Sequence, residues 1–118
     1  MLRFARIALA LSAAGLLTAC AGMITGGDLI RPGEPTGGIA VYNQTRQPIG
    51  VVLISACSAS TYGLNRLPSG VSIPQGRSYT FEVSAGCWDV DAGAIGVGEA
   101  RQRMSVSAGS VTRYTVTQ

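Results

Sequence analysis

From residue 38 onward, the chain consists of short apolar or alternating runs separated by turns rich in glycine, proline and asparagine. No stretch repeats its apolar residues at the helical spacing of i, i+3 and i+4 over three turns. Alternation with a period of two places every second side chain on one face, as a half-buried strand requires. Several short strands separated by turns predict two sheets packed face to face. We therefore expect an all-β domain.

The expected architecture is a small antiparallel β-sandwich, immunoglobulin-like or transthyretin-like, with about seven strands. Residues 48–57 are apolar almost throughout, which predicts a central strand covered on both faces. A short strand at 71–73 leads through a turn into a strand at 77–83. Residues 100–118 predict a hairpin that turns at Gly109–Ser110. Tyr79, Phe81 and Val83 share one face of the segment 77–83, and the inward candidates on the segment 100–118 are Met104, Val106, Tyr114 and Val116.

The first residues have the pattern of an export signal. Arg3 and Arg6 precede an apolar run at 7–17, and small residues follow before Cys20. The run is too short to span a bilayer, which takes about 20 apolar residues. A basic start, a short apolar run and small residues before a cleavage point predict a secretory signal.

Residues 17–20 read Leu-Thr-Ala-Cys, which resembles the lipobox of bacterial lipoproteins. The resemblance implies that Cys20 receives diacylglycerol on its sulfur, that the chain is cleaved just before it, and that the new amino group is acylated. It divides the chain into a lipoprotein signal peptide at 1–19, a lipidated tether at 20–37 and the β-sandwich at 38–118. Alanine at position 21, where aspartate would favour the inner membrane, implies the periplasmic face of the outer membrane. An ordinary signal with a chance cysteine is the alternative.

The tether is rich in glycine and proline and has no apolar period, which is typical of a flexible linker. An alternative is that its apolar residues dock on the domain or on the membrane. Those residues are Met23, Ile24, Leu29 and Ile30.

The sandwich segment carries a second, looser resemblance. The pieces VYNQT, PIGVVLIS, YGLNRL, IPQGRSYTFEV and CWDV, between residues 39 and 91, resemble small proteobacterial lipoproteins and exported β-sandwich domains of unknown function. This resemblance carries no assigned activity, so it supports the fold alone.

Composition excludes several functions. Nine basic residues face six acidic ones, but Arg3 and Arg6 belong to the expected signal. The other arginines are scattered along the chain, whereas a nucleic-acid backbone requires a clustered stripe, so we expect no nucleic-acid partner. The chain has no histidine and no lysine, and so lacks the commonest general base and zinc ligand and the Schiff-base nucleophile. We expect no enzyme, no cofactor and no metal.

Two cysteines remain when Cys20 is lipidated. Cys57 and Cys87 are an even pair in an oxidising compartment, and they lack the Cys-x-x-Cys spacing of a redox site. We therefore expect a structural disulfide between them. Because Cys87 shares a strand face with polar residues, the bridge should lie near a sheet end and hold down the loop that follows Cys57.

Asp89 and Asp91 lie two apart, so both project from one strand face, opposite Trp88. Such a pair could serve glycoside hydrolysis, which needs two suitably spaced carboxyl groups. A calcium loop would need further acidic ligands that the segment lacks. We interpret both as structural carboxylates, with Arg66 or a loop amide as the expected partner of Asp89.

The loop at 57–67 is the expected binding surface, because loops on a rigid sandwich often carry function. Tyr62, Asn65 and Arg66 could form a recognition patch there, since tyrosine and arginine are common anchors at interfaces. A solvated loop is the alternative.

These observations predict a lipid-anchored, non-catalytic binding or scaffold protein of the bacterial envelope. It would hold the membrane by its lipid and present a sheet edge or the loop at 57–67 to an envelope protein. One alternative is a module that binds or hydrolyses cell-wall glycan through Asp89 and Asp91. Another is an inhibitor of a periplasmic enzyme.

Overall fold

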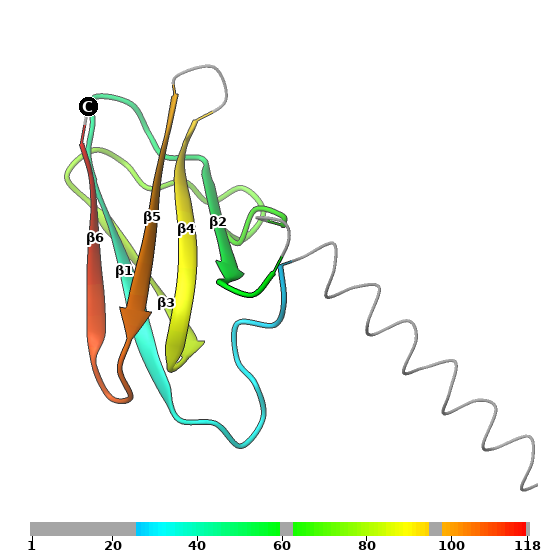
Figure 1. Cartoon of the computed structure of the whole chain (residues 1–118). Helices are drawn as coiled ribbons and strands as arrows, with labels where there is room; N and C mark the ends of the chain where they lie inside the picture. Colours follow the sequence, from blue (N-terminus) through cyan, green and yellow to red (C-terminus); the bar gives the residue numbers. More distant parts are fainter. Residues whose placement is uncertain (1–25, 60–62, 95–97, 118) are drawn as a thin grey trace, which may run out of the picture.

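The structure is a computed structural model that describes residues 26–59, 63–94 and 98–117. Two three-stranded sheets, with the strand orders β3-β1-β6 and β2-β4-β5, pack face to face (Figure 1). The expected all-β sandwich is confirmed, with six strands in the described residues instead of about seven. The expected strand at 71–73 contributes only one bridge, between Ile49 and Ile73. The strands are β1 (Thr36–Gln44), β2 (Val51–Ala56), β3 (Ser78–Ser84), β4 (Gly86–Ala94), β5 (Gly98–Val106) and β6 (Val111–Thr117).

The hydrophobic core fills the space between the two sheets. Alternation along each strand sends apolar side chains inward, and Trp88 is fully buried in this core. Its indole Nε1–H donates to the backbone oxygen of Ser84 at 2.8 Å, so the burial leaves no unpaired donor. The predicted inward residues on β5 and β6 are confirmed as buried: Met104, Val106, Tyr114 and Val116.

The predicted hairpin at the C-terminus is wrong. β5 pairs antiparallel with β4, whereas β6 pairs parallel with β1, so the two consecutive strands belong to different sheets. The connection between them bonds to β1 on both sides of its turn. Ser110 O accepts from Gly38 N, and Gly109 N donates to Thr36 O, both at 2.9 Å. These bonds make β1 the partner of β6.

β2 is an edge strand, so the prediction of a central strand at 48–57 is wrong. Its outer edge is covered by the segment 65–67, which bonds to it in place of a further strand. Arg66 N donates to Val52 O at 2.7 Å, and Leu53 and Asn65 form a bridge. This cover shields the apolar edge, which would otherwise be open to pairing with another chain.

Residues 26–35 form a strap that lies against the sandwich (Figure 1). Its backbone oxygens accept from the sheets: Gly26 O from Ala56 N at 3.1 Å, and Leu29 O from Ser84 N at 2.7 Å. The Leu29 side chain packs against the core. Leu29 therefore docks on the domain, which is the alternative considered for the tether, and β1 begins within the range expected for the tether, at Thr36.

The strap occupies one end of the sandwich, which we call the strap end. Here β1 begins beside the end of β3, because Thr36 pairs with Ser84. The turn after Ser84 and the connection at 107–110 lie at the same end, since Gly86 pairs with Val106. In the part of the chain that the structure describes, no helix has the length and apolarity to cross a membrane.

Candidate functional site

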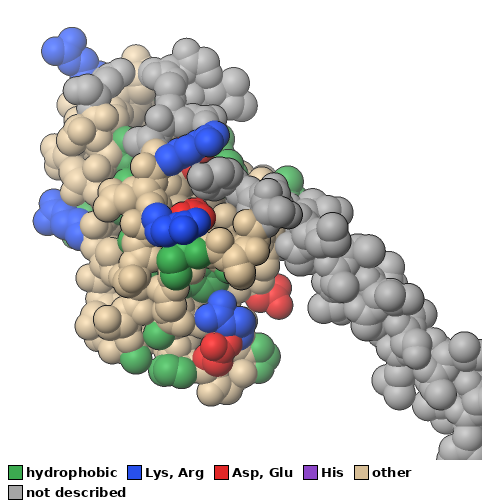
Figure 2. All heavy atoms as spheres, in the orientation of Figure 1, with side chains coloured by type: hydrophobic (Ala, Val, Ile, Leu, Met, Phe, Trp, Pro, Cys, Tyr) green, Lys and Arg blue, Asp and Glu red, His purple; other side chains and the backbone are tan. Residues whose placement is uncertain are grey.

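The two aspartates lie on the outer face of β2-β4-β5, each opposite an arginine of β5. Arg103 donates to Asp89 through Nε at 2.9 Å and Nη2 at 3.1 Å. Arg101 Nε lies 2.9 Å from Asp91 Oδ2. Figure 2, which looks onto this face, shows arginine side chains beside carboxylates. The expected partner of Asp89, Arg66 or a loop amide, is wrong, because the strand register places Arg103 opposite it.

These ion pairs make the aspartates poor catalysts. The hydrogen bond from Arg103 and its charge hold the pKa of Asp89 below its usual value, against the opposing effect of burial. A general acid in glycoside hydrolysis needs the opposite shift. The Asp91 carboxylate is buried, and its Oδ1 finds no hydrogen-bond partner among the described residues. No group of three or more His, Cys, Asp or Glu side chains among those residues could hold a metal ion.

The Cys57–Cys87 disulfide is present. It continues the β2–β4 ladder one step beyond the pair Ala56 and Trp88, with 5.5 Å between the two Cα atoms. Cys57 N also donates to Cys87 O at 3.2 Å. The bridge therefore lies at a sheet end and fixes the start of the following loop, as predicted.

The predicted recognition patch is only partly described. Tyr62 lies outside the described residues. The side chain of Asn65 binds the backbone at the start of β2. It accepts from Val52 N at 2.9 Å and donates to Gly50 O, just before the strand, at 3.0 Å. Both bonds hold the loop against the sheet edge.

Arg66 is likewise bound to backbone groups. Its Nη2 donates to Gly27 O at 2.6 Å and to Ile54 O at 3.0 Å, so it ties the strap to β2. Burial lowers the pKa of Arg66, and the charge of Asp28 opposes this shift. In the structure, Asn65 and Arg66 thus hold the loop and the strap in place.

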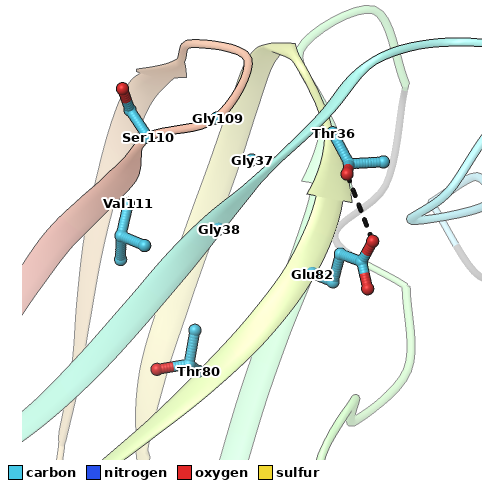
Figure 3. A pocket seen from close by; sticks show the side chains of 8 residues that line it. All are labelled: Thr36, Gly37, Gly38, Thr80, Glu82, Gly109, Ser110 and Val111. Carbon is cyan, nitrogen blue, oxygen red and sulfur yellow. Dashed lines mark hydrogen bonds between the residues drawn. The ribbon is translucent and has the colours of Figure 1, made fainter.

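A groove of about 320 Å³ lies on the outer face of β3-β1-β6, at the strap end. Its floor is the backbone of Gly37 and Gly38 on the central strand, with β3 on one side and β6 on the other (Figure 3). A methyl group built on Gly38 would lie 3.3 Å from Val111 Cγ2 and 3.4 Å from Thr80 Cγ2, so two methyl groups flank the floor. The lining residues are Thr36, Gly37, Gly38, Thr80, Glu82, Gly109, Ser110 and Val111.

The pattern of the sequence did not predict this groove. Its signal was the consecutive Gly37–Gly38 in a strand, since glycine inside a strand marks a close approach of another chain or ligand. At Gly37 another segment of the chain approaches closely, because a methyl group there would lie 2.4 Å from Ser107 O. Gly38 leaves its side of the sheet open.

Among the residues that line the groove, Glu82 alone carries a charge. Its Oε1 accepts from Thr36 Oγ1 at 3.1 Å, and it forms no ion pair with any described residue. The nearest arginine along β6, Arg113, instead lies over the Tyr42 ring, 3.8 Å from the ring centroid. Tyr42 pairs with Ser78 and Thr115, so this contact lies further along the sheet, away from Glu82. The groove is therefore negative on one wall.

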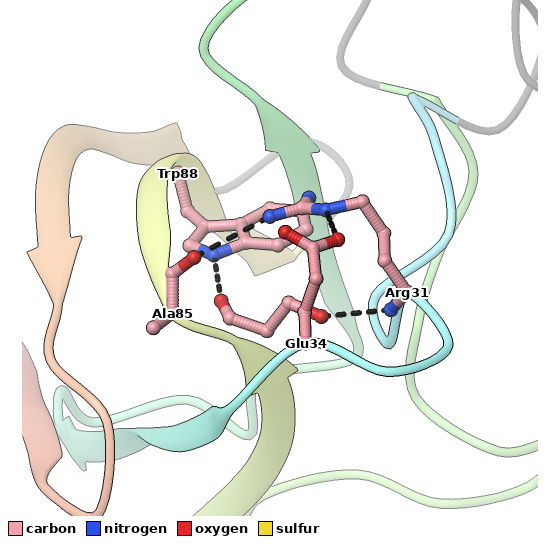
Figure 4. A network of polar contacts seen from close by, with 5 residues as sticks. Arg31, Glu34, Ala85 and Trp88 are labelled. Carbon is pink, nitrogen blue, oxygen red and sulfur yellow. Dashed lines mark hydrogen bonds and ion pairs between the residues drawn. The ribbon is translucent and has the colours of Figure 1, made fainter.

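A network of polar contacts joins the strap to the core beside Trp88 (Figure 4). Arg31 N donates to Ser84 Oγ at 2.7 Å, and its Nη2 reaches Ala85 O at 3.4 Å. The Arg31 side chain also forms an ion pair with Glu34. These contacts satisfy the polar groups at the end of β3, so the network is structural.

Comparison with known proteins adds no relative to this description. No protein-family model matches the chain, and no curated protein matches it either.

Proposed function

We propose that this protein is a non-catalytic binding module of the bacterial envelope, anchored by lipid on Cys20 to the periplasmic face of the outer membrane. Its partner is an envelope protein, which it receives in the groove on β3-β1-β6. The observation that carries the binding role is this groove, a hollow at the lower end of the range of about 300–1,000 Å³ seen for ligand sites. The anchor is supported by the lipobox-like residues 17–20 and by Ala21.

The chemistry of the groove favours binding over catalysis. Thr36 and Ser110 bring hydroxyl groups to it, but a hydroxyl nucleophile needs an adjacent base. The chain contains no histidine or lysine for that purpose, and Glu82, the carboxylate beside Thr36, is exposed to water instead of being desolvated as a tuned catalytic base is. Thr36 instead donates to Glu82, which fixes the orientation of the carboxylate.

The other candidates have less support. A glycan hydrolase would use Asp89 and Asp91, which are held in ion pairs with Arg103 and Arg101. Recognition by the loop at 57–67, which also suits an enzyme inhibitor, would use side chains that hold the loop to its own sheet. Glu82 of the groove, by contrast, makes only one side-chain hydrogen bond within the described structure, to Thr36.

The anchor is tested by mass analysis of the protein isolated from membranes. We expect a chain that begins at Cys20 and carries acyl groups, and a Cys20→Ser variant that leaves the membrane fraction. An unmodified Cys20 in the membrane-bound protein contradicts the anchor.

The binding role is tested by crosslinking in the native membrane, followed by identification of the attached protein. We expect a defined envelope protein to be captured by the native chain and by the Asp89→Asn, Asp91→Asn double variant. Gly38→Val, which fills the groove floor, should lose it. Loss of capture in the aspartate variant alone would instead favour the site on β2-β4-β5.

A further inference from the structure

The groove has the shape of a channel for one unbranched apolar stem. Its floor at Gly38 has no side chain, and the methyl groups of Thr80 and Val111 stand on either side. Val111 is 61% exposed although it is a large apolar residue on a strand, so covering it would bury apolar surface. A stem of methylene groups laid over Gly38 would lie against both of these methyl groups.

One wall of this channel is acidic. Glu82 pairs with Gly38 across the β1–β3 ladder, so its carboxylate stands beside the floor. Arg113, the cation on the facing strand, is held over Tyr42. An occupant with a positive charge beyond its apolar stem therefore complements the groove, as the side chains of lysine and arginine do.

The hydrogen bond from Thr36 distinguishes between these two cations. It uses one lone pair of Glu82 Oε1, whereas Oε2 has no hydrogen-bond partner among the described residues. An arginine fork binds best when both carboxylate oxygens are available, whereas a lysine ammonium is a compact point charge that binds one. Lysine also has the longer methylene stem.

Extending the proposed function, we propose that the groove is a receptor for a lysine side chain of an envelope protein. The stem lies over Gly38 between Thr80 and Val111, and the ammonium group binds Glu82. A second copy of this chain cannot supply the occupant, because the sequence contains no lysine. The site therefore selects a different protein.

The absence of lysine also makes a sharp test possible. A carbodiimide condenses a carboxylate with an amine in direct contact, with loss of water, and adds no spacer. We would treat outer membranes that contain the full mature protein with carbodiimide and then identify the peptides joined to Glu82. We expect an amide between Glu82 and a lysine of another envelope protein.

Matched variants connect this product to the groove. Glu82→Gln should abolish it, while Glu34→Gln, which removes another exposed carboxylate at the strap end, should leave it unchanged. Gly38→Val should reduce it by about tenfold or more, the ratio that about 1.4 kcal/mol of lost affinity produces. Val111→Ser, which removes one wall from an exposed position, should also reduce it and covers the case in which Gly38→Val does not fold.

The outcomes separate this inference from the function on which it rests. A lipidated Cys20 and a captured partner, with no lysine product at Glu82, overturn the lysine site and leave the binding module standing. A Glu82 product with an aminophospholipid or with the amino terminus of a second copy also overturns it. Equal coupling at Glu34 and Glu82 shows only exposed carboxylates and does the same. A lysine product on a chain without lipid overturns the anchor and leaves the site.

Discussion

The guanidinium carbon of Arg31 lies 5.4 Å from the centroid of the Trp88 ring, and this contact joins the strap to the core. Trp88 is fully buried and donates to Ser84 O, while Arg31 N donates to Ser84 Oγ. The same serine thus receives one bond from the core and one from the strap. The strap is therefore part of the folded domain.

Arg31→Ala should destabilise the fold by about 1–2 kcal/mol, because a cation over a buried indole is partly desolvated. Urea unfolding followed by the fluorescence of Trp88, the single tryptophan, measures this. Arg113→Ala is the matched control, since its contact with Tyr42 is exposed and should contribute less than about 1 kcal/mol. An equal loss in both variants would contradict a special role for the strap.

Gly37→Ala should destabilise the fold by about 1–3 kcal/mol through overpacking. The added methyl group would lie 2.4 Å from Ser107 O and 2.7 Å from Ser110 O, and these backbone atoms cannot move without disturbing the corner between β5 and β6. Gly50→Ala is the control, because nothing lies within 4 Å of its added carbon. Thermal unfolding of the two variants compares them, and a stable Gly37→Ala would disprove the tight approach.

Replacing both Cys57 and Cys87 with serine should cost about 3.7 kcal/mol on the chain-entropy treatment of a closed loop of this length. The two cysteines are 30 residues apart in sequence. Urea unfolding of the double variant against the native protein measures the difference. A double variant as stable as the native protein would contradict this prediction.

The pKa of Asp89 is lowered by the Arg103 hydrogen bond, so the folded protein holds this carboxylate charged more strongly than the unfolded chain does. Its contribution to stability is present above the unfolded pKa of about 3.9 and is lost as the pH falls below it. Asp89→Asn should therefore flatten the acid side of the stability profile. At neutral pH we expect a loss of only about 0–1 kcal/mol, because Arg103 is largely exposed. An unchanged acid profile would contradict this.

Burial, together with the negative charge of Asp91, raises the pKa of Tyr114 to about 12 from 10.0. The contribution of Tyr114 is complete below pH 10 and is lost as the pH rises toward 12, because the unfolded chain then gives up the phenol proton more easily. We expect a loss of about 2–3 kcal/mol across this interval. Tyr114→Phe should show a smaller alkaline loss in urea unfolding at each pH. Parallel profiles would refute the assignment.

Alternation along the strands predicted the inward faces correctly, because burial on one side of a sheet is a local property of the sequence. It placed Met104 and Tyr114 in the core. Which sheet a strand joins is not local. A period of two reads the same in a hairpin and in two strands of different sheets, so the corner at 107–110 was mistaken for a hairpin turn.

The sequence pattern also did not predict which residues face each other across neighbouring strands. Asp89 faces Arg103 because β4 and β5 pair in one register, and that register cannot be read from either strand alone. The apolar β2 was predicted as a central strand, but a loop segment with Asn65 covers its edge instead. The groove depends on a glycine floor and on two neighbouring strands, so only the Gly37–Gly38 pair hinted at it.

With the proposed lipid on Cys20, the docked strap would set how far the domain can stand from the bilayer. Five residues separate Cys20 from Gly26, so the six Cα–Cα steps between them span at most about 20 Å at ~3.5 Å each. Because this segment joins the sandwich beside its strap end, it would keep the groove close to the lipid headgroups. Proteins that offer a lysine deeper in the periplasm would then lie out of reach, and membrane neighbours would be selected by height as well as by chemistry.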